Sequence, residues 1–70
     1  MKVSARSQLP GTVKAITAGA VMAEVVIELD GGHELVAAIT AESVRQLGVE
    51  PGGRVVALIK ATEVLVAVDD

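Results

Sequence analysis

Hydrophobic and polar residues alternate most clearly between residues 20 and 29, where the sequence reads AVMAEVVIEL. Successive side chains of a β-strand point to opposite faces of a sheet, so this period of two predicts a strand. One face of the strand carries only apolar residues, namely Val21, Ala23, Val25, Ile27 and Leu29. We therefore expect that face to line the core.

Four further segments are predicted to be strands, separated by turn residues. Pro10 and Gly11 indicate the start of the first predicted strand. A proline has no N–H group and therefore suits the start or the edge of a strand. The Asp30-Gly31-Gly32 tripeptide is typical of a hairpin turn, and residues 50–53 (EPGG) predict another turn. With the strand above, the predicted strands are residues 9–18, 20–29, 34–39, 54–59 and 64–68.

The segment from Thr40 to Gly48, TAESVRQLG, has a helical pattern instead. Thr40 is a suitable N-cap residue, and Gly48 suits the left-handed position that follows a helix. Val44 and Leu47 are three residues apart, so both can face a core. We expect a helix of two turns.

The order of elements is thus β-β-β-α-β-β. This order predicts an all-β fold, a five-stranded OB-like Greek-key barrel with one short helix between strands 3 and 4, as a single domain over residues 1–70. The last two predicted strands are apolar on both faces, whereas an antiparallel strand with one solvated face alternates. We expect one of these faces to contact another subunit; the alternative is that the barrel and the helix cover both faces.

Composition supports self-association. The chain has 70 residues, of which 51% are hydrophobic, but it has no cysteine and no aromatic residue. A domain this small buries a limited core and usually needs a disulfide, a metal or a partner for stability. With one histidine and no cysteine, no bare metal ion site is expected.

Charge and hydropathy exclude two classes of partner. The net charge is −3, and binding to nucleic acid depends on neutralising phosphates with Lys and Arg. No apolar run approaches the ~20 residues of a membrane span, and the first residues do not resemble a signal peptide. We therefore expect a cytoplasmic protein with no nucleic-acid or membrane partner.

The residues that could support catalysis are too few or too far apart. The GVEPGGR segment follows the helix and precedes a strand, which is the reverse of a P-loop. His33 lies in a predicted hairpin turn. Glu24 and Glu28 would be ~13 Å apart on a strand, too far for a pair of glycosidase carboxylates. We do not expect an enzyme.

Three short polar clusters remain, and each lies at the boundary of an element. They are residues 4–7 (SARS), residues 40–43 (TAES) and residues 60–62 (KAT). Each alone is consistent with an ordinary role, as a polar tail, a helix cap and a turn. Together they offer hydroxyl groups, free backbone N–H groups and two cations, which are the groups that a tetrahedral dianion needs.

The segments SARSQLPGTV, GAVMAEVVIEL, ITAESVRQLGV and ALIKATEVLVAVD resemble the molbindin (Mop) family of small molybdate-binding proteins, over about residues 3–69. The resemblance implies an OB-like hexamer, a trimer of dimers, with molybdate or tungstate held between subunits. It implies that one subunit contributes Ser4, Ala5, Arg6, Lys60 and Ala61 and that a neighbour contributes Thr40 and Ser43. It also implies a second site that involves Ala20, Val21, Met22, Ala23 and Thr62.

The chain departs from the family pattern at three positions. Ser7 replaces the usual asparagine, Ala61 replaces a frequent serine, and Met22 replaces a frequent polar residue. The Ala61 departure removes a hydroxyl donor, and the Met22 departure affects the second site. The function implied is binding and storage of molybdate in molybdenum homeostasis. The alternatives are an oligomerising module that senses the oxyanion for a separate transporter or regulator, and a cofactor-processing enzyme.

Overall fold

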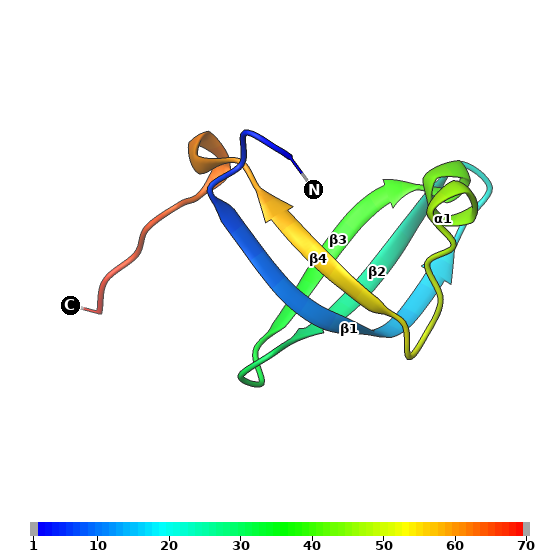
Figure 1. Cartoon of the computed structure of the whole chain (residues 1–70), viewed down its shortest axis with the longest axis horizontal. Helices are drawn as coiled ribbons and strands as arrows, with labels where there is room; N and C mark the ends of the chain where they lie inside the picture. The colour runs from blue at the N-terminus through cyan, green and yellow to red at the C-terminus, as the bar shows by residue number, and fades with distance from the viewer. Residues whose placement is uncertain (1, 70) are drawn as a thin grey trace.

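The computed structural model describes residues 2–69 and shows one curled antiparallel sheet with a short helix at one end (Figure 1). The sheet order is β3-β2-β1-β4. Helix α1 lies between β3 and β4 in the sequence, and a 3₁₀ turn, η1, follows β4, which confirms the all-β class and the position of the helix. The elements are β1 (Ser7–Ala18), β2 (Met22–Leu29), β3 (Glu34–Thr40), α1 (Ala41–Leu47), β4 (Arg54–Ile59) and η1 (Ala61–Glu63).

Strand β1 pairs with both β2 and β4 because it is long and bent. Its first half, from Ser7 to Thr12, pairs with β4, and the part from Gly11 onward pairs with β2. The register with β2 shifts at Lys14, and such a bulge bends a strand and increases its twist. Gly11 lies where β1 meets both neighbours, and a Cβ atom there would approach the Glu28 carbonyl oxygen to 2.6 Å. Only glycine lets the strands approach this closely.

The core is small and lies on the concave side of the sheet. Its central cluster consists of Val13, Val25 and Ile27, and Val44 of α1 packs against them. The predicted apolar face of β2 is therefore confirmed for its central residues. Two expectations about the core are wrong: Val21 precedes β2 and is 71% exposed, and Leu47 is 72% exposed. Leu47 is the last residue of a helix too short to pack both of its turns on the sheet.

Both predicted ends of the helix are confirmed. The Ser43 backbone N–H donates to Thr40 Oγ1 at 3.0 Å, which is the N-cap bond. Gly48 has a φ of 67°, and its N–H donates to the Arg45 carbonyl oxygen at 3.2 Å. Among residues 2–69 no helix has the length and apolar character needed to span a membrane.

The predicted fifth strand, residues 64–68, does not form, so the sheet has four strands instead of five. Val64 has extended backbone angles (φ −89°, ψ 126°), but the segment leads away from the sheet after η1 (Figure 1). Alternating apolar residues favour extended backbone, but a strand also needs a neighbouring strand to pair with. The barrel is consequently open between β3 and β4, which are the two edges of the described sheet.

Strand β4 exposes apolar side chains on its outer face, as its sequence indicates. Val55 and Ala57 pack against the core. Val56 and Leu58, which point the other way, are each 43% exposed.

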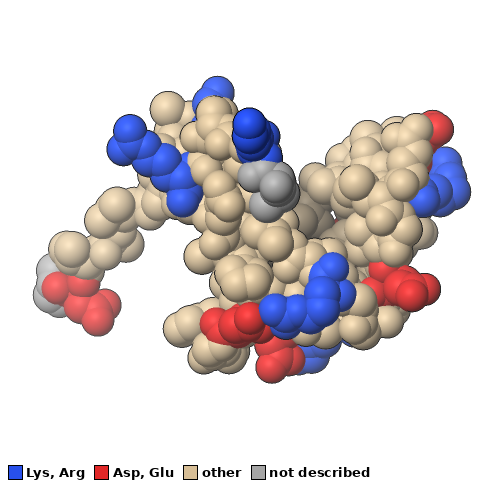
Figure 2. Space-filling model, viewed as in Figure 1, with Lys and Arg blue, Asp and Glu red and all other residues tan. Residues whose placement is uncertain are grey.

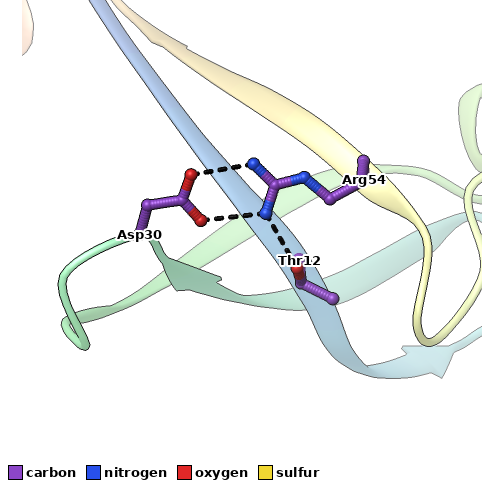
Figure 3. A network of polar contacts seen from close by, with 3 residues as sticks. All are labelled: Thr12, Asp30 and Arg54. Carbon is purple, nitrogen blue, oxygen red and sulfur yellow. Dashed lines mark hydrogen bonds and ion pairs between the residues drawn. The ribbon is translucent and has the colours of Figure 1, made fainter.

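An ion pair joins the strands at the other end of β4 (Figure 3). Arg54 Nη1 and Nη2 each donate to one Asp30 carboxylate oxygen at 2.8 Å, and Nη1 also donates to Thr12 Oγ1 at 3.0 Å. These contacts connect the start of β4, the middle of β1 and the turn after β2. The hydrogen bonds from Arg54 lower the pKa of the Asp30 carboxyl below its ordinary value of 3.8.

The stability of the Asp30→Asn variant is expected to depend less on acidic pH than that of the parent. Because the pKa of Asp30 is lower in the folded chain, its stabilising effect is present above about pH 4 and is lost as the pH falls through the folded pKa. The melting temperature of the variant should therefore be lower than that of the parent at pH 7 and should fall less between pH 5 and pH 2. Circular dichroism melts measure this, with Glu24→Gln as a control for removing an exposed carboxylate. Identical pH profiles for parent and Asp30→Asn would contradict it.

Candidate oxyanion site

A surface hollow lies where the N-terminal stretch meets the end of β4. It is lined by Ser4, Ala5, Arg6, Leu58, Lys60, Ala61 and Thr62. The pairing of Ser7 with Ile59 brings these two stretches together, although they are more than fifty positions apart in the sequence. Gln8 Nε2 donates to the Ala5 carbonyl oxygen at 3.0 Å, which holds the N-terminal stretch against β1.

The hollow offers positive charge and hydrogen-bond donors. Its lining includes the two cations Arg6 and Lys60 and includes no carboxylate. Lys and Arg side chains gather at this end of the molecule (Figure 2). Within η1 only Glu63 N–H bonds back, to the Lys60 carbonyl oxygen at 2.9 Å, because the first N–H groups of a helical turn have no partner inside it. The N–H groups of Ala61 and Thr62 can therefore serve a ligand.

A second group of donors lies at the start of α1. Thr40 Oγ1 donates to Ser43 Oγ at 2.7 Å while it accepts from the Ser43 N–H group. Having accepted this bond, the Ser43 hydroxyl still has its own proton to donate. A shallow hollow here is lined by Ala20, Val21, Thr40, Glu42, Ser43, Arg45 and Gln46.

The two groups lie at opposite ends of the same chain (Figure 1). β1 runs between them: Ser7 at one end pairs with Ile59, and Ala18 at the other end pairs with Ala23. A strand of this length spans on the order of 30 Å. One copy of the chain therefore does not bring Ser4, Arg6 and Lys60 together with Thr40 and Ser43.

The residues predicted for a second site are also divided. Ala20 and Val21 line the hollow at the start of α1, and the half-exposed Met22 pairs with Thr40. Ala23 is buried in the core, with 3% of its surface exposed. Thr62 lies at the other end, beside Lys60.

Four lining residues are absent from the predicted site residues, namely Leu58 in the first hollow and Glu42, Arg45 and Gln46 in the second. Arg45 was not predicted to belong to the site, but it lines the same hollow as Thr40 and Ser43. Leu58 was predicted only as part of the strand over residues 54–59. The signal for Arg45 was its position one helical turn after Ala41, which places it over the N-terminal turn of α1. No sequence signal indicates Leu58.

Residues 2–69 hold no group of three or more His, Cys, Asp or Glu side chains able to bind a metal ion. His33 is exposed in the turn after β2, and Glu24 and Glu28 are exposed on β2. The hydroxyl groups, backbone N–H groups and cations that line the two hollows can donate hydrogen bonds to an acceptor-rich anion and attract its charge.

Comparisons with known proteins agree with this chemistry. Residues 3–66 match the family model of the TOBE domain. The chain is 42% identical over 66 residues to "Molybdenum-pterin-binding protein 1" of Clostridium pasteurianum, covering 94% of this chain and 97% of that one. It superimposes on a molybdate-binding protein from Sporomusa ovata with a TM-score of 0.90 and 52% identity, covering 96% of this chain and 98% of that one.

A second similar structure contains the ligand. It is the cytoplasmic molybdate-binding protein ModG with molybdate bound, which matches with a TM-score of 0.83 and 49% identity over 87% of this chain and 43% of that one. The chain therefore belongs to the TOBE-domain family, and within it to the small molybdenum-pterin-binding (Mop) proteins.

Proposed function

We propose that this protein binds molybdate, or the similar tungstate, reversibly and stores it without chemical change. The observation that carries the proposal is the hollow that joins Arg6 and Lys60 to hydroxyl and backbone N–H donors. A tetrahedral dianion has four oxygens that only accept hydrogen bonds, so cations and donors without a carboxylate suit it. Ala61 contributes a backbone N–H and no hydroxyl.

The composition favours the free oxyanion over a pterin-bound form of molybdenum. A flat pterin ring is commonly held by stacking on aromatic side chains. This chain has no aromatic residue. Charge and hydrogen bonds are what the hollow offers.

We also propose that each site is shared between two copies of the chain, with residues 4–6 and 60–61 from one copy and Thr40 and Ser43 from another. The hollow at the N-terminal end has a volume of about 430 Å³. A four-oxygen anion occupies only a few times the ~30 Å³ of a water molecule, which is much less than the volume of the hollow. A second surface is therefore needed to enclose the anion. The hydroxyl groups at the start of α1 are suitable for this and lie at the far end of the same chain.

In this proposal the protein is a homo-oligomer, and the Mop pattern makes a hexamer the specific expectation. The apolar outer face of β4 provides surface for such contacts. ModG is described as cytoplasmic, and we propose the same compartment for this chain.

Mixed assemblies test the shared site. Lys60→Ala and Ser43→Ala are each expected to bind molybdate at least about tenfold more weakly than the parent. Ser43→Ala is chosen because the N-cap bond uses the Ser43 backbone N–H, which the substitution keeps. If the two variants are unfolded together and refolded as a 1:1 mixture, about one quarter of the sites combine two intact halves by random symmetric assembly. Isothermal titration should then recover about that fraction of tight sites.

Two controls accompany the mixture. Each variant refolded alone should recover no tight sites, and a 1:1 mixture of Lys60→Ala with Lys14→Ala should recover about half of them, because only the Lys60→Ala copies lack a site residue. A site contained in a single chain would give no recovery in the first mixture, and this result would overturn the sharing. Failure of the parent to bind molybdate would overturn the function itself.

A further inference from the structure

Residues 4–6, which line part of the oxyanion hollow, are attached to the sheet by a side chain. Gln8 Nε2 donates to the Ala5 carbonyl oxygen at 3.0 Å. Within residues 2–69 this is the one hydrogen bond that the structure gives to residues 4–6 outside the strand ladders. The position of Ala5 and of its neighbour Arg6 therefore depends on the Gln8 amide.

Gln8 lies beside the hollow and does not line it. It pairs with Leu58 across β1 and β4, and Leu58 lines the hollow. Directly opposed residues of an antiparallel pair have side chains on the same face of the sheet. The Gln8 amide is thus close enough to the site to affect it, although the Gln8 side chain is exposed and does not belong to the core.

The bond from Gln8 also occupies an acceptor beside the hollow. The carbonyl oxygens of Lys60 and Ala61 accept N–H groups from the backbone of η1 and of the residue after it, at 2.9 and 3.3 Å. The Ala5 carbonyl oxygen accepts from a side chain instead. Three carbonyl oxygens of the lining residues therefore already hold a donor, and none of the lining side chains is a carboxylate. What the hollow offers to a ligand is mainly donors.

A surface of this kind distinguishes oxyanions by their protons. Sulfate and hydrogen phosphate are both tetrahedral dianions of similar size, but hydrogen phosphate has one O–H group, and a donor enclosed without an acceptor is costly. Molybdate, like sulfate, has no proton at neutral pH and only accepts. A free Ala5 carbonyl oxygen would take the phosphate proton and would also compete with a proton-free anion for the donors of Arg6 and Lys60.

We propose that Gln8 is a positioning residue that makes the oxyanion site selective for anions without a proton. Its amide holds residues 4–6 in place, and it prevents the Ala5 carbonyl oxygen from accepting a proton of the ligand or from pairing with the cations. The selectivity rests on the proposed function, because it concerns the same site, whereas the positioning of residues 4–6 does not.

Competition titrations of the parent test the selectivity. In mildly alkaline buffer, where phosphate is a dianion with one proton, sulfate should displace molybdate at a concentration at least about fivefold lower than phosphate does. Equal charge and similar size leave the proton as the difference between the two competitors. Phosphate that competes as well as sulfate would overturn the selectivity.

The Gln8→Met and Gln8→Asn variants test whether Gln8 is responsible. Methionine has a similar length and no donor, and asparagine keeps the amide but is one methylene shorter. Both variants should bind molybdate at least about threefold more weakly than the parent, and their preference for sulfate over phosphate should fall by at least about twofold. An equal loss of affinity for all three anions would indicate only a loosened structure. That result, or parent-like affinities, would overturn the proposal.

Thr17→Val is the matched control for a polar change on β1. Thr17 is exposed near the other end of β1 and lines neither hollow. It should bind the three anions like the parent. Circular dichroism and ultracentrifugation should show the same fold and assembly for the parent, the control and both Gln8 variants, because the Gln8 side chain is exposed.

Nuclear magnetic resonance of the empty protein tests the positioning alone. In Gln8→Met the backbone order parameters of Ala5 and Arg6 should fall relative to the parent, because the hydrogen bond that holds them is lost. Those of Val13 in the core should not change. Unchanged values at residues 5 and 6 would overturn the positioning. If the parent binds no molybdate, the proposed function fails, and this measurement still decides whether Gln8 holds residues 4–6.

Discussion

A hundredfold excess of molybdate over its dissociation constant is expected to raise the free energy of unfolding by about 2.7 kcal/mol, because a ligand that binds only the folded, assembled protein stabilises it by mass action. For a domain of this size the melting temperature should rise by roughly 10–20 °C. Calorimetry or far-ultraviolet circular dichroism measures the shift, since the chain has no aromatic residue for fluorescence.

Sulfate is the control anion, because it is also a tetrahedral dianion but is smaller. At matched ionic strength it should raise the melting temperature far less, since a site sized for molybdate leaves a smaller anion with longer hydrogen bonds. Equal shifts with both anions would indicate general screening of Arg6, Lys60 and their neighbours instead of a specific site.

The Lys60→Ala variant is expected to bind molybdate at least tenfold more weakly than the parent, equivalent to about 1.4 kcal/mol. The whole chain has a net charge of −3, so long-range attraction does not favour a dianion, and the local cations must supply it. In the empty site, Lys60 and Arg6 line the same hollow and repel each other. The empty oligomer should therefore stay intact or become slightly more stable.

Lys14→Ala is the matched control, since it removes the same charge from an exposed position on β1 where Lys14 pairs with Glu34. Exposed ion pairs of this kind contribute little to stability, so molybdate affinity and assembly should stay close to those of the parent. Isothermal titration compares the three proteins. Parent-like affinity of Lys60→Ala would show that residues 60–62 form only a connecting turn.

Features that depend on neighbours in the sequence could be predicted without the structure. The period of two identified β2 and placed Val25 and Ile27 in the core, and the cap residues identified both ends of α1. The polar clusters were found for the same reason, since hydroxyls and small residues at element boundaries have local roles. Arg45 was missed because a basic residue in the last turn of a helix is common and does not by itself indicate a site. The structure places it in the same hollow as Thr40 and Ser43.

The sequence alone determined which segments extend, where the helix begins and ends, and which side chains can serve an oxyanion, because these properties follow from local backbone preference and side-chain chemistry. Only the tertiary structure decided which segments meet. The pairing of Ser7 with Ile59 assembles the hollow, and the direction of the chain after η1 leaves residues 64–68 without a neighbour in their own sheet. The physical reason is that a strand's conformation is local, whereas its partner is set by long-range packing and by the hydrogen bonds of distant backbone.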